Sequence, residues 1–531
     1  MSSFQSSVFI AMKIPAKLSH THRNHDGCCI NYGSFLRKVK NRINIFCCQN
    51  DETMRAYGGF SSNNSTQPER TKQALPLKNV VVDGRATTPT ATATATATVV
   101  ESSSGIGVVK FHQGRSYFIT GATGFVAKVL IEKLLRTVPN VGKIFVLIKA
   151  KNKEAALDRL KNEVIDSELF ECLKQVMLGK SYEAFMLSKL IPVVGNVCES
   201  NLGMDANTTR EIAKEVDVLI NSAANTTFDE RYDVLLNTNT RGPCQLSSFA
   251  KKCNRLSLFL HVSTAYVSGD REGVIMEKPF YIGESIAEKR VTSENHTSYQ
   301  KLDVHTEIKL ALDLGRSFQD NVGDEKKKEL GLERAISYGW RNTYELSKAM
   351  GEMLISSKRG EIAWPVVFVR PSIIQSTYKE PFPGWIQGYR MGDPLIFSYG
   401  KGHLPGFPGN PAAVLDIIPL DMVVNAMIAA MAKHGIAGKP DMNVYHVASS
   451  IANPLMLQDF FKFQYEYFRS SPLMDSKGKR IDITEMRFSS SMDDFSSYIG
   501  KEILQQSGLT DVTVSDEKLS QLEDSVGNAK R

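Results

Sequence analysis

The stretch that decides the fold reads YFITGATGFVAK and runs from Tyr117 to Lys128. An apolar run enters a glycine-rich turn, and a helical pattern follows at once. Gly121 permits the tight turn, Gly124 lets the backbone approach a pyrophosphate, and Ala127 lets the helix pack against a sheet. The helix amino terminus offers free N–H groups and a positive dipole to phosphates. The stretch therefore predicts a dinucleotide-binding loop between a first strand and a first helix.

Short apolar runs, bounded by Gly, Asn, Lys or Pro, recur after this loop and alternate with amphipathic stretches such as 126–135 and 154–164. Runs of this length are typical of strands buried on both faces. They cover residues 117–119, 144–148, 191–194, 218–220, 258–262 and 366–369. Strand–helix alternation predicts an α/β fold with a doubly wound parallel sheet of the Rossmann type.

Three regions are expected along the chain. Residues 1–105 are expected to form a disordered transit peptide and linker, and residues 106–454 the dinucleotide-binding Rossmann domain. That domain carries two substrate insertions, a charged helix-rich one at 278–340 and a Gly- and Pro-rich one at 375–415. Insertions after the carboxyl ends of strands are where such folds bind substrates. Residues 455–531 form a short carboxyl-terminal domain.

The amino-terminal region is poor in acidic residues and rich in basic and hydroxyl residues, with an Ala-Thr repeat at 87–98. Such a composition cannot form a core and is typical of an organelle transit peptide. The alternative is a disordered tail without an address.

Composition limits the function classes. With 42% hydrophobic and 23% charged residues, the rest of the chain should be globular. A net charge of +7 suits a protein that meets anionic ligands and does not by itself indicate nucleic acid. No Cys/His spacing suggests a metal site, and no apolar run is long enough for a transmembrane span.

The end of the second strand indicates which dinucleotide is bound. NAD-binding folds usually place a carboxylate there to hold the ribose 2′-hydroxyl. This sequence has Lys149 and Lys151 instead, which would attract a 2′-phosphate. The pattern favours NADPH, unless these lysines only begin a solvated helix.

Tyr344 and Lys348 lie one helical turn apart. A neighbouring ammonium should lower the pKa of the phenol and prepare it for proton transfer to a carbonyl oxygen. A surface helix pair would show the same spacing. The hydroxyl residues Ser263 and Thr264, at the end of an earlier predicted strand, favour the catalytic interpretation.

The chain resembles an extended short-chain dehydrogenase/reductase, and more narrowly a plant fatty acyl-CoA reductase of the male-sterility-protein type. The resemblance covers roughly residues 110 to 470. It is carried by TGATGFVAK at 120–128, NSAA at 221–224, HVSTAYV at 261–267, NTYELSK at 342–348, VRPSII at 369–374, PFPGWI at 381–386 and DIIPLDMVVN at 416–425.

This resemblance implies the reduction of a long-chain acyl-CoA or acyl-carrier-protein thioester to a primary alcohol through an aldehyde, with two NADPH. Tyr344 would be the acid, Lys348 its partner, and Thr264 the carbonyl-polarising hydroxyl, with Ser263 as the alternative. The expected cofactor contacts are Thr120, Gly121, Thr123, Gly124, Phe125, Lys149, Asn196, Val197, Asn221, Ala223, Tyr344, Lys348, Arg370, Ser372 and Ile373. Male-sterility-type relatives also suggest a plastid location. Peripheral membrane contact stays open, and no nucleic-acid partner is expected.

Two departures from the family pattern stand out. Asn196 replaces an aspartate near the expected adenine pocket, and the carboxyl-terminal region looks shortened after Tyr498. One rival interpretation is another extended short-chain reductase or sugar-nucleotide epimerase, against which the PFPGWI segment and the long insertion argue. The other is a binding homologue with weakened catalysis.

Overall fold

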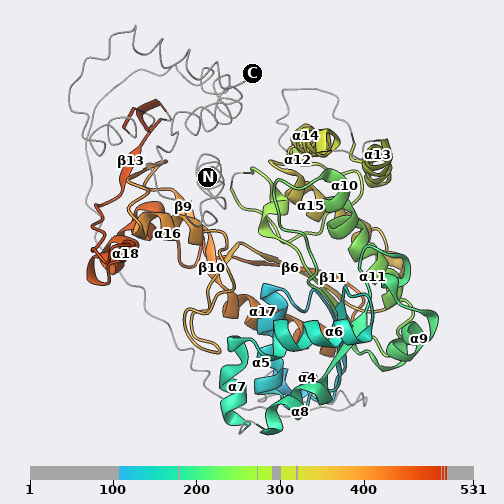
Figure 1. Ribbon diagram of the computed structural model, residues 1–531. Coiled ribbons are helices and arrows are strands. Elements are labelled where there is room, and N and C mark those ends of the chain that lie inside the picture. Colours follow the sequence, from blue (N-terminus) through green and yellow to red (C-terminus); the bar gives the residue numbers. More distant parts are fainter. Residues whose placement is uncertain are drawn as a thin grey trace, which may run out of the picture. The chain divides into compact units, whose positions relative to one another are not determined.

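A seven-stranded sheet, parallel throughout, organises the protein (Figure 1). The computed structural model describes residues 107–177, 180–271, 273–289, 301–317, 321–491, 493–495 and 497–498. The strands follow the order β11-β6-β5-β4-β1-β2-β3. Their bounds are β1 Tyr117–Thr120, β2 Ile144–Ile148, β3 Leu190–Val194, β4 Val218–Asn221, β5 Leu258–Val262, β6 Val366–Pro371 and β11 Met442–Val447.

The strand order reverses between β1 and β4, which lie side by side in the sheet. Such a switch point opens a crevice at the carboxyl ends of the strands, where doubly wound folds bind their ligands. All six predicted strands are present, and the predicted doubly wound fold is confirmed. The edge strand β11 is an addition that the sequence patterns did not indicate.

Alternate residues of the strands pack into two cores, one on each face of the sheet, as the pleat requires. One core contains Ile119 and Val146 together with helices α5 (Phe125–Thr137) and α17 (Leu420–Ala437). The helices α4, α6, α7 and α8 also pack on this face; their bounds are Val108–His112, Lys153–Leu160, Glu171–Val176 and Lys180–Lys189.

The opposite face packs Phe118 and Leu147 against helices α9, α11 and α15. These helices span Ala206–Glu215, Gly242–Ala250 and Thr343–Ser356. Layers on both faces of the sheet explain why the predicted strands read as continuous apolar runs.

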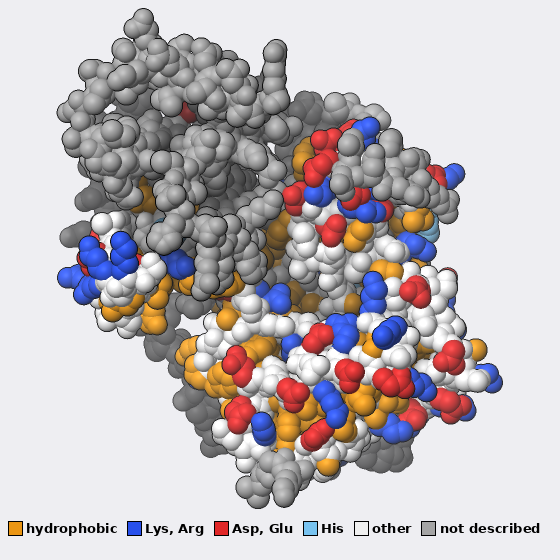
Figure 2. Space-filling model, in the orientation of Figure 1, with side chains coloured by type: hydrophobic (Ala, Val, Ile, Leu, Met, Phe, Trp, Pro, Cys, Tyr) orange, Lys and Arg blue, Asp and Glu red, His pale blue; other side chains and the backbone are white. Residues whose placement is uncertain are grey.

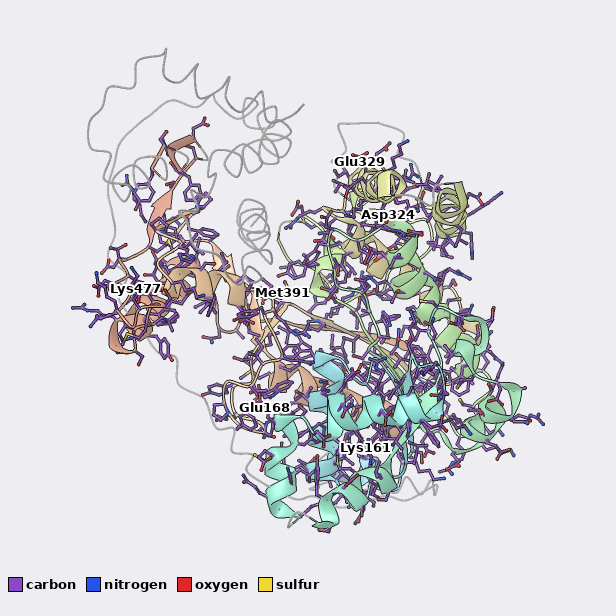
Figure 3. All side chains as sticks on the ribbon, in the orientation of Figure 1. Lys161, Glu168, Asp324, Glu329, Met391 and Lys477 are labelled. Atoms are coloured by element: carbon purple, nitrogen blue, oxygen red, sulfur yellow. The ribbon has the colours of Figure 1, made fainter. Side chains whose placement is uncertain are left out.

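The described part of the first predicted insertion is largely helical. Helices α12 (Ile286–Lys289), α13 (Val304–Ser317) and α14 (Asn321–Ser337) join α10 (Tyr232–Leu235) and one side of α15 in a third core. Glu307 is buried there, and its carboxylate accepts hydrogen bonds from Tyr232, Tyr338 and Arg334. Figure 3 labels two residues of α14, Asp324 and Glu329.

The second insertion packs with the segment that follows residue 455. Helices α16 (Asp393–Gly400) and α18 (Leu457–Ser470) share an aromatic core with short strands. These strands are β8 Gly406–Pro408, β9 Val414–Leu415, β10 Ile417–Pro419, β12 Leu455–Met456 and β13 Arg487–Ser489. A further short strand, β7 Ile373–Gln375, pairs with β10. Residues on both sides of 455 therefore belong to one cluster.

The predicted helix at 154–164 changes character near its end. After α6 the backbone continues as a π-helical turn, η2 (Lys161–Ile165), whose first residue is labelled in Figure 3. None of the helices in the described ranges is long and apolar enough to cross a membrane. On the face shown in Figure 2, basic and acidic side chains are interspersed among apolar ones.

Candidate active site

The predicted dinucleotide loop joins β1 to α5. Gly121 has a φ of +69°, and a Cβ there would lie 2.7 Å from the backbone nitrogen of Ala223. Glycine is therefore required at this turn. Helix α5 begins after Gly124 with no side-chain cap and no acidic residue in its first turn. This terminus is free to receive an anion.

A buried hydrogen-bond chain ties the carboxyl ends of β1, β4 and β5 together beside the loop. The Ala223 N–H donates to Thr120 Oγ1 (3.2 Å), whose hydroxyl donates to Asn221 Oδ1 (2.8 Å). The Asn221 amide nitrogen lies 2.8 Å from His261 Nδ1. Because the Asn221 oxygen takes the threonine hydroxyl, its nitrogen donates to Nδ1, which assigns the imidazole hydrogen to Nε2.

Helix α15 carries Tyr344 and Lys348 and is fixed by its amino-terminal cap. The Asn342 side chain accepts from the Glu345 N–H (2.9 Å), and the Asn342 amide donates to the Glu345 carboxylate (3.1 Å). The pair has capping-box spacing, but the Glu345 carboxylate binds the Asn342 side-chain amide and the Arg341 N–H (3.4 Å) in place of the Asn342 N–H. It fixes the start of the helix at Thr343, one residue before Tyr344.

The end of β5 meets this helix at two points. The Lys348 ammonium donates to the Val262 carbonyl oxygen (2.8 Å), and the Tyr344 hydroxyl is hydrogen-bonded to the Thr264 side chain. The Tyr344 ring also packs edge-on against Phe228, with 5.3 Å between the ring centroids. The structure thus brings Tyr344, Lys348 and Thr264 together, as the sequence predicted.

Ser263, the alternative to Thr264, faces other surroundings. Its side chain is buried, and its hydroxyl has no hydrogen-bond partner among the described residues. Ser372 Oγ and His261 Nε2 are in the same condition. Buried polar atoms normally have partners, so three such atoms near the carboxyl ends of β5 and β6 suit a polar ligand at this edge. Ile373 follows on β7 and is buried.

The expected effect on the tyrosine is wrong in direction. Burial raises the pKa of Tyr344 above its ordinary value, and the Glu345 carboxyl adds to the rise, while the hydrogen bond from Thr264 opposes it. Burial also lowers the pKa of Lys348 to about 8, with Glu352 opposing the change. A largely protonated phenol at neutral pH is the form that a general acid requires.

Basic groups lie at the end of β2. The Lys149 side chain is exposed, and its carbonyl oxygen accepts a hydrogen bond from Arg159 Nη1 (2.8 Å). Arg159 pairs with Glu163 (2.6 Å), which also hydrogen-bonds Thr123 of the dinucleotide loop. Arg159 was missed from the sequence, because its position in the last turn of α6 gives no sign that it reaches back ten residues to Lys149.

Asn196 and Val197 lie after β3. The Asn196 side chain accepts from the Cys198 N–H (3.1 Å) and donates to Glu199 (2.9 Å), so it stabilises the local turn. Val197 is buried in the core on the α9 and α11 face. An aspartate at position 196 could accept the Cys198 N–H in the same way, so the asparagine in this chain preserves the turn.

The Arg370 side chain, which extends from β6, is paired inside the protein. It is 1% exposed, and its guanidinium binds the Glu352 carboxylate, the Lys278 carbonyl oxygen (3.0 Å) and His446 Nε2 (3.1 Å). Its hydrogen-bonding groups are therefore committed to the protein. The sequence pattern located Arg370 on β6 but gave no sign of these partners.

Three further residues, Asn239, Gly351 and Glu345, support the site from behind. Asn239, which is fully buried, donates to Ser347 Oγ on α15 (3.0 Å) and to the Asn225 carbonyl oxygen after β4 (2.9 Å). Gly351 allows α15 to approach the Asn239 backbone, which a Cβ would strike. Burial raises the pKa of Glu345 to about 7. Only Glu345 had a signal in the sequence, its capping-box spacing from Asn342.

The family model described as "Male sterility protein" matches residues 119–427. Fatty acyl-CoA reductase 2, chloroplastic, of Arabidopsis thaliana is 56% identical over 414 residues, covering 77% of this chain and 66% of that protein. The alcohol-forming fatty acyl-CoA reductase of Simmondsia chinensis is 40% identical over 398 residues, covering 74% of this chain and 78% of that protein. Among solved structures, the terminal R domain of the myxalamid pathway aligns with a TM-score of 0.47 and 18% identity, over 77% of this chain and 78% of that domain.

The family match covers more than half of the chain and extends from β1 into α17. It includes the dinucleotide loop and both candidate catalytic residues. The chain belongs to the male sterility protein family, whose plant members include the fatty acyl-CoA reductases.

Proposed function

We propose that this protein reduces a long-chain acyl thioester to a primary fatty alcohol with NADPH. The observation that carries the proposal is the meeting of Tyr344 and Lys348 with the end of β5, in a chain of this family. The dinucleotide loop beside it supports the cofactor. Thr120, Gly121, Thr123, Gly124, Phe125, Asn221 and Ala223 would hold its phosphates and the adjoining groups.

The chemistry takes two rounds. When bound, the reduced nicotinamide supplies the hydride in each round. In the first, the thioester carbonyl carbon gains a hydride and its oxygen gains a proton from Tyr344, which gives a hemithioacetal. The Tyr344 phenolate takes back the hydroxyl proton as the thiolate leaves, which gives the aldehyde, and solvent protonates the thiolate. In the second round a further hydride and the Tyr344 proton give the alcohol, and solvent restores the phenol. Thr264 hydrogen-bonds the reacting oxygen, and Lys348 stabilises the phenolate that remains.

The full-length protein should convert acyl thioesters to alcohols when NADPH is supplied, with products identified by mass spectrometry. Acyl-CoA and acyl-carrier-protein donors are compared across salt concentrations. If an acidic carrier protein is the donor, its advantage should shrink as salt screens the attraction. The exposed Lys401 and His403 after α16 are candidate contacts. If the ratio of the rates with the two donors does not change with salt, the carrier protein is contradicted as the donor. If neither alcohol nor aldehyde is formed, the proposed function is contradicted.

Cofactor choice is tested at the end of β2. Lys149→Glu should shift the ratio of kcat/KM for NADPH over NADH toward NADH by about tenfold, because a carboxylate would face the 2′-phosphate. Lys153→Glu, a charge reversal at another exposed lysine, on α6, is the control. An unchanged ratio in Lys149→Glu would leave Lys151 and Arg159 as the remaining candidate readers of that phosphate.

We also propose a plastid location. The acid-poor composition of residues 1–105 supports it, as does the Arabidopsis relative named chloroplastic. Residues 1–105 lie outside the described ranges, so the support from this region comes from its sequence alone. Fused to a fluorescent protein, they should direct it to plastids in plant cells. A diffuse cytosolic signal would contradict the assignment.

A further inference from the structure

Asp421, in the first turn of α17, accepts hydrogen bonds from three successive backbone N–H groups of one loop. Its Oδ1 takes the N–H of Tyr378 (2.8 Å), and its Oδ2 takes those of Lys379 (2.9 Å) and Glu380 (3.1 Å). Asp421 is 5% exposed. One buried carboxylate thus organises the backbone of residues 378–380.

The same loop closes on itself and presents a tryptophan. Thr377 Oγ1 donates to the Phe382 carbonyl oxygen (2.7 Å) and accepts from the Trp385 N–H (3.0 Å). The Thr377 N–H donates in turn to the Trp385 carbonyl oxygen (3.0 Å). Residues 377–385 therefore form a closed unit, the clamp loop, that Asp421 holds from α17.

The clamp loop contacts α5 at both ends of the helix. At the amino end, the Trp385 ring stacks on Phe125, with ring centroids 5.7 Å apart and an interplanar angle of 21°. Phe125 is the first residue of α5 and follows Gly124 of the dinucleotide loop. At the other end, Glu380 pairs with Lys133 and with Arg136 (2.8 Å).

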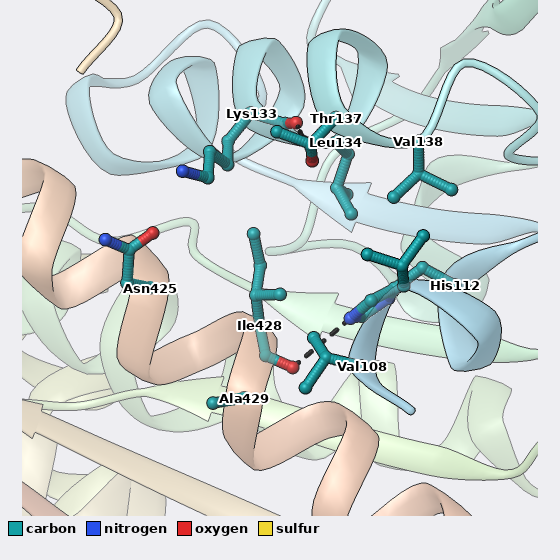
Figure 4. A pocket seen from close by; sticks show the side chains of 10 residues that line it. Val108, His112, Lys133, Leu134, Thr137, Val138, Asn425, Ile428 and Ala429 are labelled. Atoms are coloured by element: carbon teal, nitrogen blue, oxygen red, sulfur yellow. Dashed lines mark hydrogen bonds between the residues drawn. The ribbon is translucent and has the colours of Figure 1, made fainter. Parts of the chain in front are cut away.

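Direct packing between α5 and α17 is incomplete. A hollow of about 280 Å³, lined mainly by apolar atoms, lies between α4, α5 and α17 (Figure 4). Lys133 and Leu134 line it from α5, and Asn425 and Ile428 from α17. The clamp loop bridges the two helices beside this gap, since Glu380 reaches Lys133 while Asp421 holds the loop.

We propose that Asp421 is a positioning residue for the dinucleotide: through the clamp loop and the Trp385–Phe125 stack it fixes the phosphate-binding end of α5. Asp421 is too engaged with the loop backbone to bind the cofactor itself. This inference rests on the proposed cofactor. The consequence is that losing the Asp421 carboxylate should loosen the first turn of α5 and weaken dinucleotide binding more than it slows chemistry.

The test uses the full-length protein and measures NADPH affinity directly from nicotinamide fluorescence. Asp421→Asn should raise the Kd for NADPH about tenfold, and the KM for NADPH similarly, with kcat at saturating NADPH within twofold of the wild type. Asp217→Asn is the matched control. Asp217 is also buried, and it accepts a hydrogen bond from the backbone N–H of Ser116 (2.8 Å). It lies just before the amino end of β4, however, and the dinucleotide loop lies at the carboxyl ends of the strands. It should lose stability without losing affinity.

Trp385 supplies a second readout. The chain has three tryptophans, so subtracting the spectrum of Trp385→Phe isolates the emission of Trp385. In Asp421→Asn this emission should shift to the red as the ring gains solvent exposure. Trp385→Leu should weaken NADPH binding about as much as Asp421→Asn, whereas Trp385→Phe, which keeps a ring on Phe125, should bind almost normally.

Three outcomes would overturn the inference. An Asp421→Asn protein with an unchanged Kd and a stability loss equal to that of Asp217→Asn would leave Asp421 a purely structural residue. Normal NADPH affinity in Trp385→Leu would show that the Trp385–Phe125 stack does not position α5 for the dinucleotide. This result would count even if Asp421→Asn failed to fold. A wild-type protein that did not bind NADPH would refute the proposed cofactor first, and this inference with it.

Discussion

Tyr344→Phe should lower turnover of an acyl thioester by about 10² to 10⁴-fold, the contribution that general acid catalysis typically makes. The substitution keeps the ring that packs against Phe228 and removes only the hydroxyl and its bond to Thr264. NADPH affinity and the unfolding midpoint should therefore stay close to those of the wild type. Steady-state kinetics, a fluorescence titration and a denaturation curve measure the three quantities.

The control is Tyr232→Phe. Tyr232 is also buried and donates its hydroxyl hydrogen to Glu307 (2.7 Å), but it belongs to the third core, which α10 forms with α12, α13, α14 and α15. That variant should lose stability while keeping turnover. Undiminished turnover in Tyr344→Phe would remove Tyr344 from the chemistry, whereas a loss shared by both variants would point to general disruption.

The same assays can distinguish the roles of the two hydroxyl residues after β5, Ser263 and Thr264. Thr264→Val removes the group that contacts Tyr344 and keeps the shape of the side chain, so turnover should fall by about 10-fold or more. Ser263→Ala should have the smaller effect, because Ser263 makes no described hydrogen bond to Tyr344 or Lys348. The reverse order would restore Ser263 as the polarising residue.

The sequence could predict most of the sheet because its strands are buried on both faces. The run at 144–148, for example, is buried throughout in β2. The edge strand β11 was missed for the complementary reason. Only Val444 of β11 is fully buried, and Asn443 and His446 interrupt its apolar pattern. An edge strand lacks the second packed neighbour that makes a run apolar.

The catalytic pair was predictable because it depends on local spacing along a helix, whereas its electrostatics were not. The sequence shows Lys348 one turn from Tyr344 but not how deeply either is buried, and burial is the largest influence on both pKa values. The Arg159 contact with Lys149 and the Asp421 contact with the clamp loop depend on tertiary structure in the same way. No local pattern encodes which backbone groups a distant side chain will reach.

Arg370 shows the same limit most sharply, and its pair with Glu352 leads to the second large effect. Glu352 is fully buried on α15, on the same helical stripe as Tyr344 and Lys348, and Arg370 Nε donates to its Oε1 (2.9 Å). Removing one partner of a buried ion pair typically costs about 3–5 kcal/mol, because the other charge is left without compensation. Glu352→Leu and Arg370→Met should each lower the free energy of unfolding by about this amount, measured by chemical denaturation.

The double variant should be more stable than either single variant, since no unpaired charge remains buried and apolar side chains replace both. Glu352→Leu should also lower the pKa of Lys348 below about 8, because Glu352 is the group that opposes the effect of burial there. The alkaline limit of activity should then move to lower pH, because the Lys348 ammonium loses its proton at a lower pH.

Arg370→Met discriminates between the two roles considered for this residue. Weakened NADPH binding without a loss of stability would make Arg370 a cofactor contact, as its sequence motif suggested. A large loss of stability that Glu352→Leu partly restores would show that β6 and α15 are joined by this pair, with Arg370 supporting the helix that carries Tyr344.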